Sequence, residues 1–327
     1  MEQKKPTPAE IEQAAKTVAA MRAEIGRAVV GQSDVVDQVL VALLAAGHVL
    51  LEGVPGLGKT LLVRALAKTF SGSYARIQFT PDLMPADVTG HTLYDQATRE
   101  FVTRRGPVFT NLLLADEINR APAKTQAALL EVMQEGQVTI EGRSEMLAPP
   151  FMVLATQNPI EQEGTYALPE AQLDRFLLKV RIDYPGAGDE ARMVRQVTQG
   201  QVGDRLNVEA VATLVDPATV LALQTITASL AVDDQVLDYA VRLSRATRNW
   251  SGVTAGAGPR GGIALTRAAR AAALVAGRDF VTPDDVKIMA LPALRHRVTP
   301  APELELEGQS SDMILKTLID QVEAPRK

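Results

Sequence analysis

The chain has 327 residues, more than a single domain usually contains, so two domains of unequal size are expected. Hydrophobic residues make up 46% and charged residues 22%, which predicts a folded, globular protein rather than a disordered one. The formal net charge of −5 argues against constitutive nucleic-acid binding, and the absence of cysteine excludes disulfides, thiolate zinc sites and cysteine nucleophiles.

The amino-terminal segment and the longest apolar stretch predict neither a secretory signal nor a membrane span. Residues 1–10 are polar and carry two prolines, which predicts a loose tail. The apolar stretch at 35–51 is interrupted by polar side chains and runs into a glycine loop, so it predicts a buried helix followed by a strand. We therefore expect a cytoplasmic protein without direct membrane insertion.

Apolar periodicity then predicts alternating helices and strands. Helical spacing is found at residues 11–29, 34–46 and 60–70. Short apolar runs bounded by turn residues predict strands at residues 48–52, 74–79, 111–115 and 151–156. Helices between such strands indicate an α/β fold with a parallel sheet and crossover connections.

Two segments do not fit a minimal parallel core. Residues 92–103 and 136–147 alternate in character around turn-like centres at Asp95-Gln96 and Glu141-Gly142. Such alternation around a short turn predicts β-hairpins. We interpret both as insertions into the core.

A break in the pattern marks the boundary between the two expected domains. The segment Tyr184-Pro185-Gly186-Ala187-Gly188 is rich in turn residues, and nearly everything after it has helical composition. We predict a larger α/β core over 1–185 and a small helical domain over 186–327.

A glycine-rich segment after the first predicted strand matches the phosphate-binding pattern G-x-x-x-x-G-K-[ST]. Its residues are Gly53, Val54, Pro55, Gly56, Leu57, Gly58, Lys59 and Thr60, and it opens a helix that continues with Leu61. The glycines let backbone N–H groups converge on phosphates, and Lys59 can reach the β- and γ-oxygens. The Thr60 hydroxyl is a ligand for magnesium. The predicted cofactors are ATP and Mg²⁺.

An acidic pair follows another predicted strand. Asp116 and Glu117 stand at the carboxyl end of the apolar run Leu112 to Ala115, beside the glycine loop in a parallel sheet of this kind. Asp116 would hold magnesium, mostly through water, and Glu117 would polarise the attacking water as a general base. The alternative is an ordinary acidic pair at the start of a helix.

Three polar residues further on could complete the chemistry. Asn158, after the strand at 151–156, could orient the attacking water, although Asn-Pro after a strand is by itself a turn. Arg175 could stabilise transition-state charge in a neighbouring subunit, or form an intrachain salt bridge. Arg260 could contact the γ-phosphate in its own chain, or be a solvated surface residue. The three histidines lack metal-ligand spacing, so no zinc site is expected.

Together these residues resemble the MoxR family of AAA+ ATPases, and the similarity runs from about residue 29 to residue 298. The matching segments are residues 30–32, 47–60, 77–83, 115–122, 155–159, 170–176 and 279–285. The resemblance implies a P-loop AAA+ core with a parallel sheet and β-hairpin inserts, followed by a helical lid domain. One departure is Gly258, where relatives commonly have serine, two residues before Arg260.

The resemblance also implies roles for individual residues and for partners. It assigns Asp116 and Glu117 as the Walker B pair, Asn158 as sensor 1, Arg175 as the arginine finger, Arg260 as sensor 2, and Val30 and Gly31 as neighbours of the adenine. Members are thought to form homo-oligomeric rings, usually hexamers with the hairpins facing a central pore. They are thought to act as chaperone-like motors on client proteins or metalloenzymes, often beside a partner with a von Willebrand factor A domain.

Two other functions stay open from the sequence. A nucleic-acid motor would need basic hairpin tips, but the tips carry mixed charges, with Arg99 beside Asp95 and Glu100, and Arg143 beside Glu141 and Glu145. A nucleotide-gated scaffold with little turnover would not need Glu117, Asn158 and Arg175 together. We therefore expect ATP hydrolysis coupled to the remodelling of a protein client.

Overall fold

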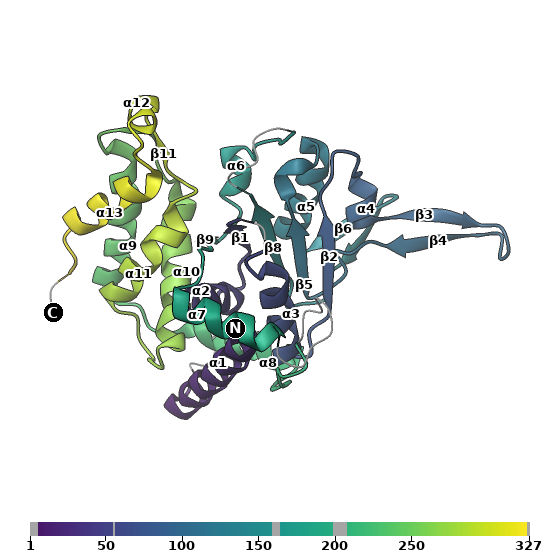
Figure 1. Cartoon of the computed structure of the whole chain (residues 1–327), viewed down its shortest axis with the longest axis horizontal. Helices are drawn as coiled ribbons and strands as arrows, with labels where there is room; N and C mark the ends of the chain where they lie inside the picture. Colours follow the sequence, from purple (N-terminus) through teal and green to yellow (C-terminus); the bar gives the residue numbers. More distant parts are fainter. Residues whose placement is uncertain (1–5, 55, 159–163, 199–207, 326–327) are drawn as a thin grey trace.

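The computed structural model describes residues 6–54, 56–158, 164–198 and 208–325. Figure 1 shows an α/β core joined to a helical part, with one long hairpin extending from the far end of the core. None of the described helices combines the length and the apolar character needed to cross a bilayer. The architecture confirms the expected AAA+ core followed by a helical lid.

A five-stranded sheet forms the centre of the core, in the order β2-β5-β8-β1-β9. All of its pairings are parallel, so the carboxyl ends of the strands meet at one edge. Four strands were predicted and one was not. The strands are β1 (Val49–Glu52), β2 (Tyr74–Gln78), β5 (Leu112–Asp116), β8 (Met152–Gln157) and β9 (Leu178–Arg181).

Helices cover both faces of this sheet. Leu112 and Leu114 pack in the same cluster as helices α1, α2 and α3, whereas Leu113 and Ala115 pack with α4 and α5 on the other face. Successive residues of a strand point to opposite faces, so both faces of the central strands are apolar. The core helices are α1 (Pro8–Ala28), α2 (Ser33–Leu44), α3 (Lys59–Thr69), α4 (Pro85–Thr89), α5 (Ala123–Glu135) and α6 (Glu170–Leu173), with a short 3-10 helix at Ile118–Arg120.

The expected loose tail over 1–10 is corrected by the start of helix α1. Thr7 caps this helix and forms a capping box with Glu10, and Pro8 occupies the first turn. A capping threonine followed three residues later by glutamate satisfies backbone N–H groups at a helix start. Residues 8–10 are therefore helical, and residues 1–5 lie outside the described part of the chain.

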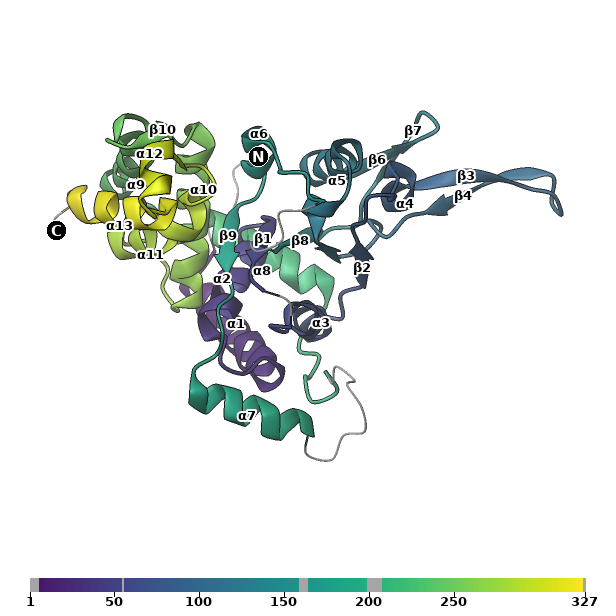
Figure 2. The same ribbon diagram turned by 45° about the horizontal axis from the view of Figure 1, so that its top comes forward.

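Both predicted hairpins are present. Strands β3 (Gly90–Asp95) and β4 (Glu100–Arg105) form the long projection in Figures 1 and 2, and β6 (Gln137–Ile140) and β7 (Arg143–Met146) form a shorter one. Arg105 donates to Glu145 Oε2 at 3.0 Å and so joins the two hairpins near their bases. Further out, Tyr94 and Phe101 face each other across the long hairpin, with ring centroids 5.3 Å apart.

The chain after β9 is mainly helical. Helix α7 (Ala187–Thr198) bonds to α1 through Gln196 and Arg27, and helix α8 (Pro217–Ser229) bonds to α2 through Gln224 and Leu43. The remaining elements form a bundle that packs on the core through α10 against α2 and α11 against β9. They are α9 (Asp234–Ala246), a 3-10 helix at Thr247–Asn249, β10 (Val253–Ala255), α10 (Pro259–Val275), α11 (Pro283–Leu294), β11 (Thr299–Pro300), α12 (Pro302–Leu306) and α13 (Ser311–Gln321). The exact domain boundary near residue 186 stays a prediction.

Candidate nucleotide-binding site

The glycine loop connects β1 to α3 at the carboxyl edge of the sheet. Gly56 and Gly58 adopt φ values of +87° and +75°, a region that side chains other than glycine rarely adopt. Helix α3 begins at Lys59 directly after Gly58. Gly53 lies so close to β9 that an added Cβ would meet the Ile182 carbonyl oxygen at 2.6 Å. Pro55, which also belongs to the predicted loop, lies outside the described residues.

Lys59 lies near the predicted acidic pair. Its ammonium donates to the Gly53 carbonyl. Burial lowers the pKa of Lys59, and the negative charges of Asp116, Glu117 and Glu52 oppose that shift. The fold therefore brings Lys59 and both carboxylates together at one edge, as the sequence predicted. Thr60 and Leu61 stand in the same first turn of α3 and are half-buried.

Asp116 ends strand β5 and is held by side chains of both neighbouring strands. Its Oδ1 accepts a hydrogen bond of 2.6 Å from Thr156 Oγ1 on β8. Its Oδ2 accepts a charge-assisted bond of 2.6 Å from Arg76 Nη2 on β2. The carboxylate therefore has a fixed orientation, and it is an oxygen donor of the kind that magnesium prefers.

Glu117 adopts an unusual backbone conformation. Its φ of +55° and ψ of +49° lie in the left-handed region, which costs free energy for a residue other than glycine. Its amide donates to Thr156 Oγ1 at 2.9 Å, and its carboxylate accepts from Gln78 Nε2 at 2.7 Å. Arg120 Nε lies 3.1 Å from the same carboxylate oxygen. Strain of this kind concentrates at functional sites, and here neighbouring strands hold the residue in place.

Thr156, Arg76 and Gln78 are functional candidates that the sequence reasoning missed. Thr156 is fully buried and bonds to both acidic residues through one hydroxyl. Each of the three is on or near the carboxyl end of a strand adjacent to β5. A signal was present, because polar residues that end apolar strands of a parallel sheet converge at one edge.

Asn158 follows β8 directly and is buried. Strand β8 lies between β1 and β5, and the Gly53 amide donates to the Gln157 carbonyl at 3.4 Å. Asn158 therefore stands between the glycine loop and the acidic pair, at the same edge of the sheet.

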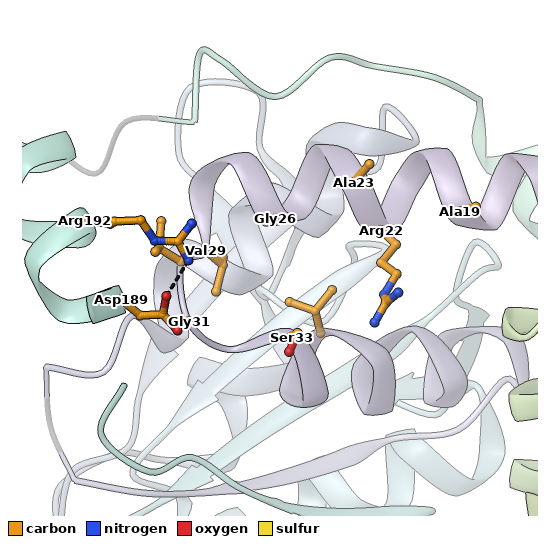
Figure 3. Close-up of a pocket in the computed structure, with 11 residues that line it drawn as sticks. Ala19, Arg22, Ala23, Gly26, Val29, Gly31, Ser33, Asp189 and Arg192 are labelled. Carbon is orange, nitrogen blue, oxygen red and sulfur yellow. Dashed lines mark hydrogen bonds and ion pairs between the residues drawn. The ribbon is translucent and has the colours of Figure 1, made fainter. Parts of the chain in front are cut away.

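Val30 and Gly31 line a pocket of about 480 Å³ between helices α1 and α2, with Asp189 and Arg192 of α7 at its mouth (Figure 3). Gly31 has a φ of +75°, and an added Cβ would come within 2.9 Å of Pro185. The segment after β9 thus contacts Gly53 through Ile182 and Gly31 through Pro185. The segment from Ile182 to Pro185 therefore lies between Gly31 and the glycine loop.

Arg175 lies at the opposite edge of the sheet. It precedes β9, and its Nη1 donates to the Leu130 carbonyl at 2.7 Å. The amide of Leu177 donates to the carbonyl of His48, the residue before β1. Because β1 separates His48 from Gly53, the two edges are roughly 16 Å apart along this strand. The carboxylate of Asp174, the residue before Arg175, pairs with Arg297.

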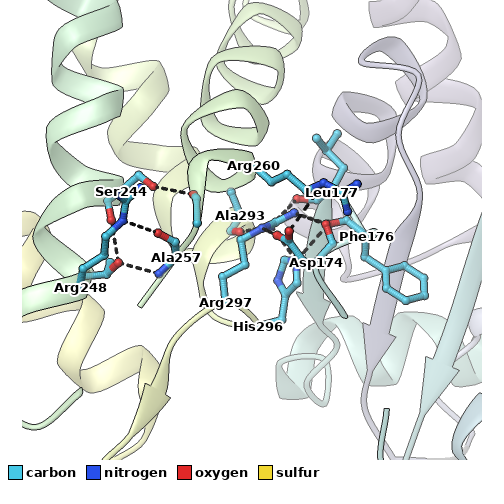
Figure 4. Close-up of polar contacts among 12 residues, drawn as sticks. Asp174, Phe176, Leu177, Ser244, Arg248, Ala257, Arg260, Ala293, His296 and Arg297 are labelled. Atoms are coloured by element: carbon cyan, nitrogen blue, oxygen red, sulfur yellow. Dashed lines mark hydrogen bonds and ion pairs between the residues drawn. The ribbon is translucent and has the colours of Figure 1, made fainter. Parts of the chain in front are cut away.

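Arg260 lies at the start of helix α10, close to Asp174. Its Nε lies 3.8 Å from Asp174 Oδ2 (Figure 4), and it lines the same pocket as Arg175. The cause is the docking of the lid, in which α10 packs on α2 and α11 packs on β9, so the start of α10 faces the start of β9. The structure therefore groups Arg260 with Arg175 and not with Lys59 and the acidic pair.

The two arginines share a pocket of about 290 Å³ between core and lid. Arg267 and Arg297 also line this pocket, and Asp174 is the single carboxylate among its lining residues. Cationic side chains in such excess can receive an anionic group.

Comparisons with known proteins agree with this geometry. Residues 48–178 match the ATPase family associated with various cellular activities (AAA), and residues 245–318 match the AAA lid domain. The phosphate loop, acidic pair and helical lid thus belong to an AAA+ ATPase.

Individual relatives narrow this class to a family. YeaC of Bacillus subtilis, whose function is uncharacterized, is 46% identical over 92% of each chain. Chaperone MoxR1 of Mycobacterium tuberculosis is 45% identical over 93% of this chain and 81% of its own length. A crystal structure of a candidate ATPase from Cytophaga hutchinsonii, 40% identical, superposes with a TM-score of 0.89 over 97% of this chain and 98% of that one. The chain belongs to the MoxR family of AAA+ ATPases.

Proposed function

We propose that the chain is a magnesium-dependent ATPase that works as a ring, in which Arg175 and Arg260 of one subunit complete the nucleotide site of the next. One observation carries this proposal. Lys59 and the acidic pair lie at the carboxyl edge of the sheet, whereas Arg175 and Arg260 lie at the opposite edge. A rigid sheet cannot bring its own edges together, but head-to-tail contact between copies can. Such contacts close into rings when the rotation between copies permits. Six subunits is the number that the family resemblance suggests.

The residues at the carboxyl edge fit the chemistry of phosphoryl transfer to water. Loop N–H groups and Lys59 bind the phosphates, and Asn158 orients the attacking water. The water attacks the γ-phosphorus, the bond to the β–γ bridging oxygen breaks, and Glu117 accepts the proton that the water loses. Thr60 and Asp116 would hold Mg²⁺, which when bound neutralises phosphate charge.

The long hairpin is the element that we assign to the client. Tyr94 and Phe101 are 53% and 76% exposed near its tip, far more than aromatic side chains in the core. Its tip carries acidic and basic residues together, which favours a protein client over nucleic acid. We propose chaperone-like remodelling or activation of a client protein or metalloenzyme, with a von Willebrand factor A domain protein as a partner.

Steady-state ATP hydrolysis tests the proposed activity. Wild type, Glu117→Gln and the control Glu131→Gln, an exposed glutamate on α5, are compared with magnesium present and with magnesium chelated. The oligomeric fraction is followed by ultracentrifugation over a dilution series. Magnesium-dependent activity that follows the assembled fraction, persists in Glu131→Gln and disappears in Glu117→Gln supports the proposal. Turnover by Glu117→Gln contradicts the assigned base, and full activity of a monomer contradicts the shared site.

A further inference from the structure

The lid contacts the chain segment that carries Arg175 through two buried neighbours, His296, whose Nε2 lies 3.0 Å from the Phe176 carbonyl, and Arg297, which makes most of the contacts. The side chain of Arg297, just beyond helix α11, is only 4% exposed. Its Nε donates to Asp174 Oδ1 at 2.6 Å, and its Nη2 donates to the carbonyls of Asp174 and Phe176 at 3.0 and 2.7 Å. Its Nη1 donates to the carbonyls of Leu177, at 3.3 Å, and of Ala293 (Figure 4).

These contacts use the whole hydrogen-bonding capacity of the guanidinium. A guanidinium has five N–H groups in a fixed planar arrangement, and Arg297 has five oxygen acceptors, with His296 Nε2 a further 2.7 Å neighbour of Nη1. Burial lowers the pKa of Arg297 and the Asp174 carboxylate opposes this shift, as expected for a buried ion pair. Arg297 therefore has no N–H group left for a nucleotide, and its role is within its own chain.

The held segment includes the predicted arginine finger. Arg175 lies between Asp174 and Phe176, two residues to which Arg297 donates hydrogen bonds, and the Phe176 side chain is fully buried. The same Asp174 carboxylate lies 3.8 Å from Arg260, whose side chain is half exposed. The Asp174–Arg297 pair therefore fixes the backbone of one proposed trans-acting arginine and contacts the side chain of the other.

We propose that Arg297, paired with Asp174, is the positioning residue for Arg175. The lid of each subunit thereby sets the geometry with which that subunit completes its neighbour's nucleotide site. This inference rests on the proposed trans role of Arg175. Lysine cannot replace Arg297, because an ammonium lacks the planar fork that reaches a carboxylate and several carbonyls at once.

Complementation between variant subunits tests the inference. Arg297→Lys should bind a fluorescent ATP analogue and assemble as wild type does, while kcat falls by about 10²-fold, as expected for a displaced catalytic group. Mixing Arg297→Lys with Glu117→Gln should recover hydrolysis, because the finger of Glu117→Gln completes the intact site of Arg297→Lys. Mixing Arg297→Lys with Arg175→Ala should recover none, because neither subunit supplies a working finger. The reverse pattern would show that Arg297 serves its own subunit's site and would overturn the inference.

Two further variants serve as an independent disruption of the ion pair and as a control. Asp174→Asn removes the ion pair from the core side and should complement in the same way as Arg297→Lys, so the test does not depend on one variant folding. Arg295→Lys is the matched control, because Arg295 is also a buried lid arginine but contacts Asp312 and the Lys179 carbonyl. An equal loss of kcat in Arg295→Lys would mean that lid docking in general is required, and it would contradict a specific role for Arg297. The mixture of Arg175→Ala with Glu117→Gln separates the two proposals, since its failure would refute trans action itself.

Discussion

The two edges of the central sheet differ in the sign of the charge that they concentrate. At the carboxyl edge, Asp116 and Glu117 face Lys59, and each carboxylate has a defined partner from a neighbouring strand. At the amino edge, four arginines line one pocket with a single carboxylate. The first edge holds the residues predicted to bind the nucleotide, and the second holds more arginines than carboxylates. This difference supports the proposed contact between the carboxyl edge of one copy and the amino edge of the next.

The arginines of the amino edge also differ among themselves. The Arg297 side chain is buried and fully bonded, whereas that of Arg260 is 51% exposed with a long contact to Asp174. Exposed arginines with weak partners can turn towards a phosphate, and buried ones cannot. Arg260 meets this condition, and the half-buried Arg175 keeps an Nε that no hydrogen bond among the described residues uses. These are the two arginines that we expect to act across an interface.

The largest expected effect is that of removing Arg175. Arg175→Ala should lower kcat by ~10³-fold or more, because an arginine finger stabilises charge that develops in the transition state. ATP binding by the same subunit should be unchanged, since Lys59 and the glycine loop are at the other edge. Steady-state kinetics and equilibrium binding of a fluorescent ATP analogue measure the two effects. Arg195→Ala, an exposed arginine on α7, is the control, and weakened ATP binding by Arg175→Ala would place Arg175 in its own chain's site.

A smaller effect is expected at Thr156 on the carboxyl edge. Thr156→Val keeps the shape of the side chain but removes the bonds to Asp116 and to the Glu117 amide. Leaving these groups unsatisfied should lower kcat by roughly tenfold, with little change in KM. Steady-state kinetics with Thr139→Val as the exposed control provide the comparison. An unchanged kcat would show that the acidic pair holds its geometry without Thr156.

A stability effect is expected from His48 at the amino edge. His48 Nδ1 accepts from the Val153 amide and Nε2 lies 3.0 Å from the Met133 carbonyl, which fixes a neutral tautomer. Burial lowers its pKa to about 4 from the ordinary value of 6.5. The unfolded chain therefore binds more protons between these pH values, so stability falls as pH falls through that window, by up to about 1 kcal/mol per pH unit. Urea unfolding of wild type and His48→Gln should show the additional pH dependence only in wild type, and parallel curves would contradict it.

The smallest effect on basal turnover is expected in the long hairpin, outside both edges. A double variant, Tyr94→Ala with Phe101→Ala, should leave basal hydrolysis within about twofold of wild type, because surface substitutions away from a site perturb it little. Stimulation of hydrolysis by an unfolded protein such as casein should be lost. Thr92→Ala with Thr103→Ala, on the same hairpin face, is the matched control. Basal activity that collapses in the aromatic variant would mean that the hairpin supports the site itself.

Local sequence patterns predicted the carboxyl edge well. The glycine loop, Asp116, Glu117 and Asn158 follow apolar strands directly, so sequence position alone placed them together. Both hairpins were predicted from alternation around a turn. Strand β9 was missed because it is an edge strand in which Lys179 and Arg181 alternate with apolar residues, and these side chains pair with Glu52 on β1.

The amino edge could not be predicted in the same way. The position of Arg260 depends on how α10 and α11 dock on α2 and β9, contacts between segments more than a hundred residues apart. The ion pair between Arg297 and Asp174 likewise joins residues that are 123 positions apart in the chain. Local periodicity does not predict such contacts. The ends of parallel strands, in contrast, meet at one edge of the sheet, so the residues that follow them can be placed from the sequence.

The most direct test of the account mixes Arg175→Ala subunits with Glu117→Gln subunits, each inactive alone, over a range of ratios. If the edges of two copies form one site, hydrolysis should reappear in the mixture, be maximal near equal amounts, and approach roughly one quarter of the wild-type rate for random assembly of independent interfaces. Absence of activity at every ratio, with mixed oligomers shown to form, would contradict the shared site.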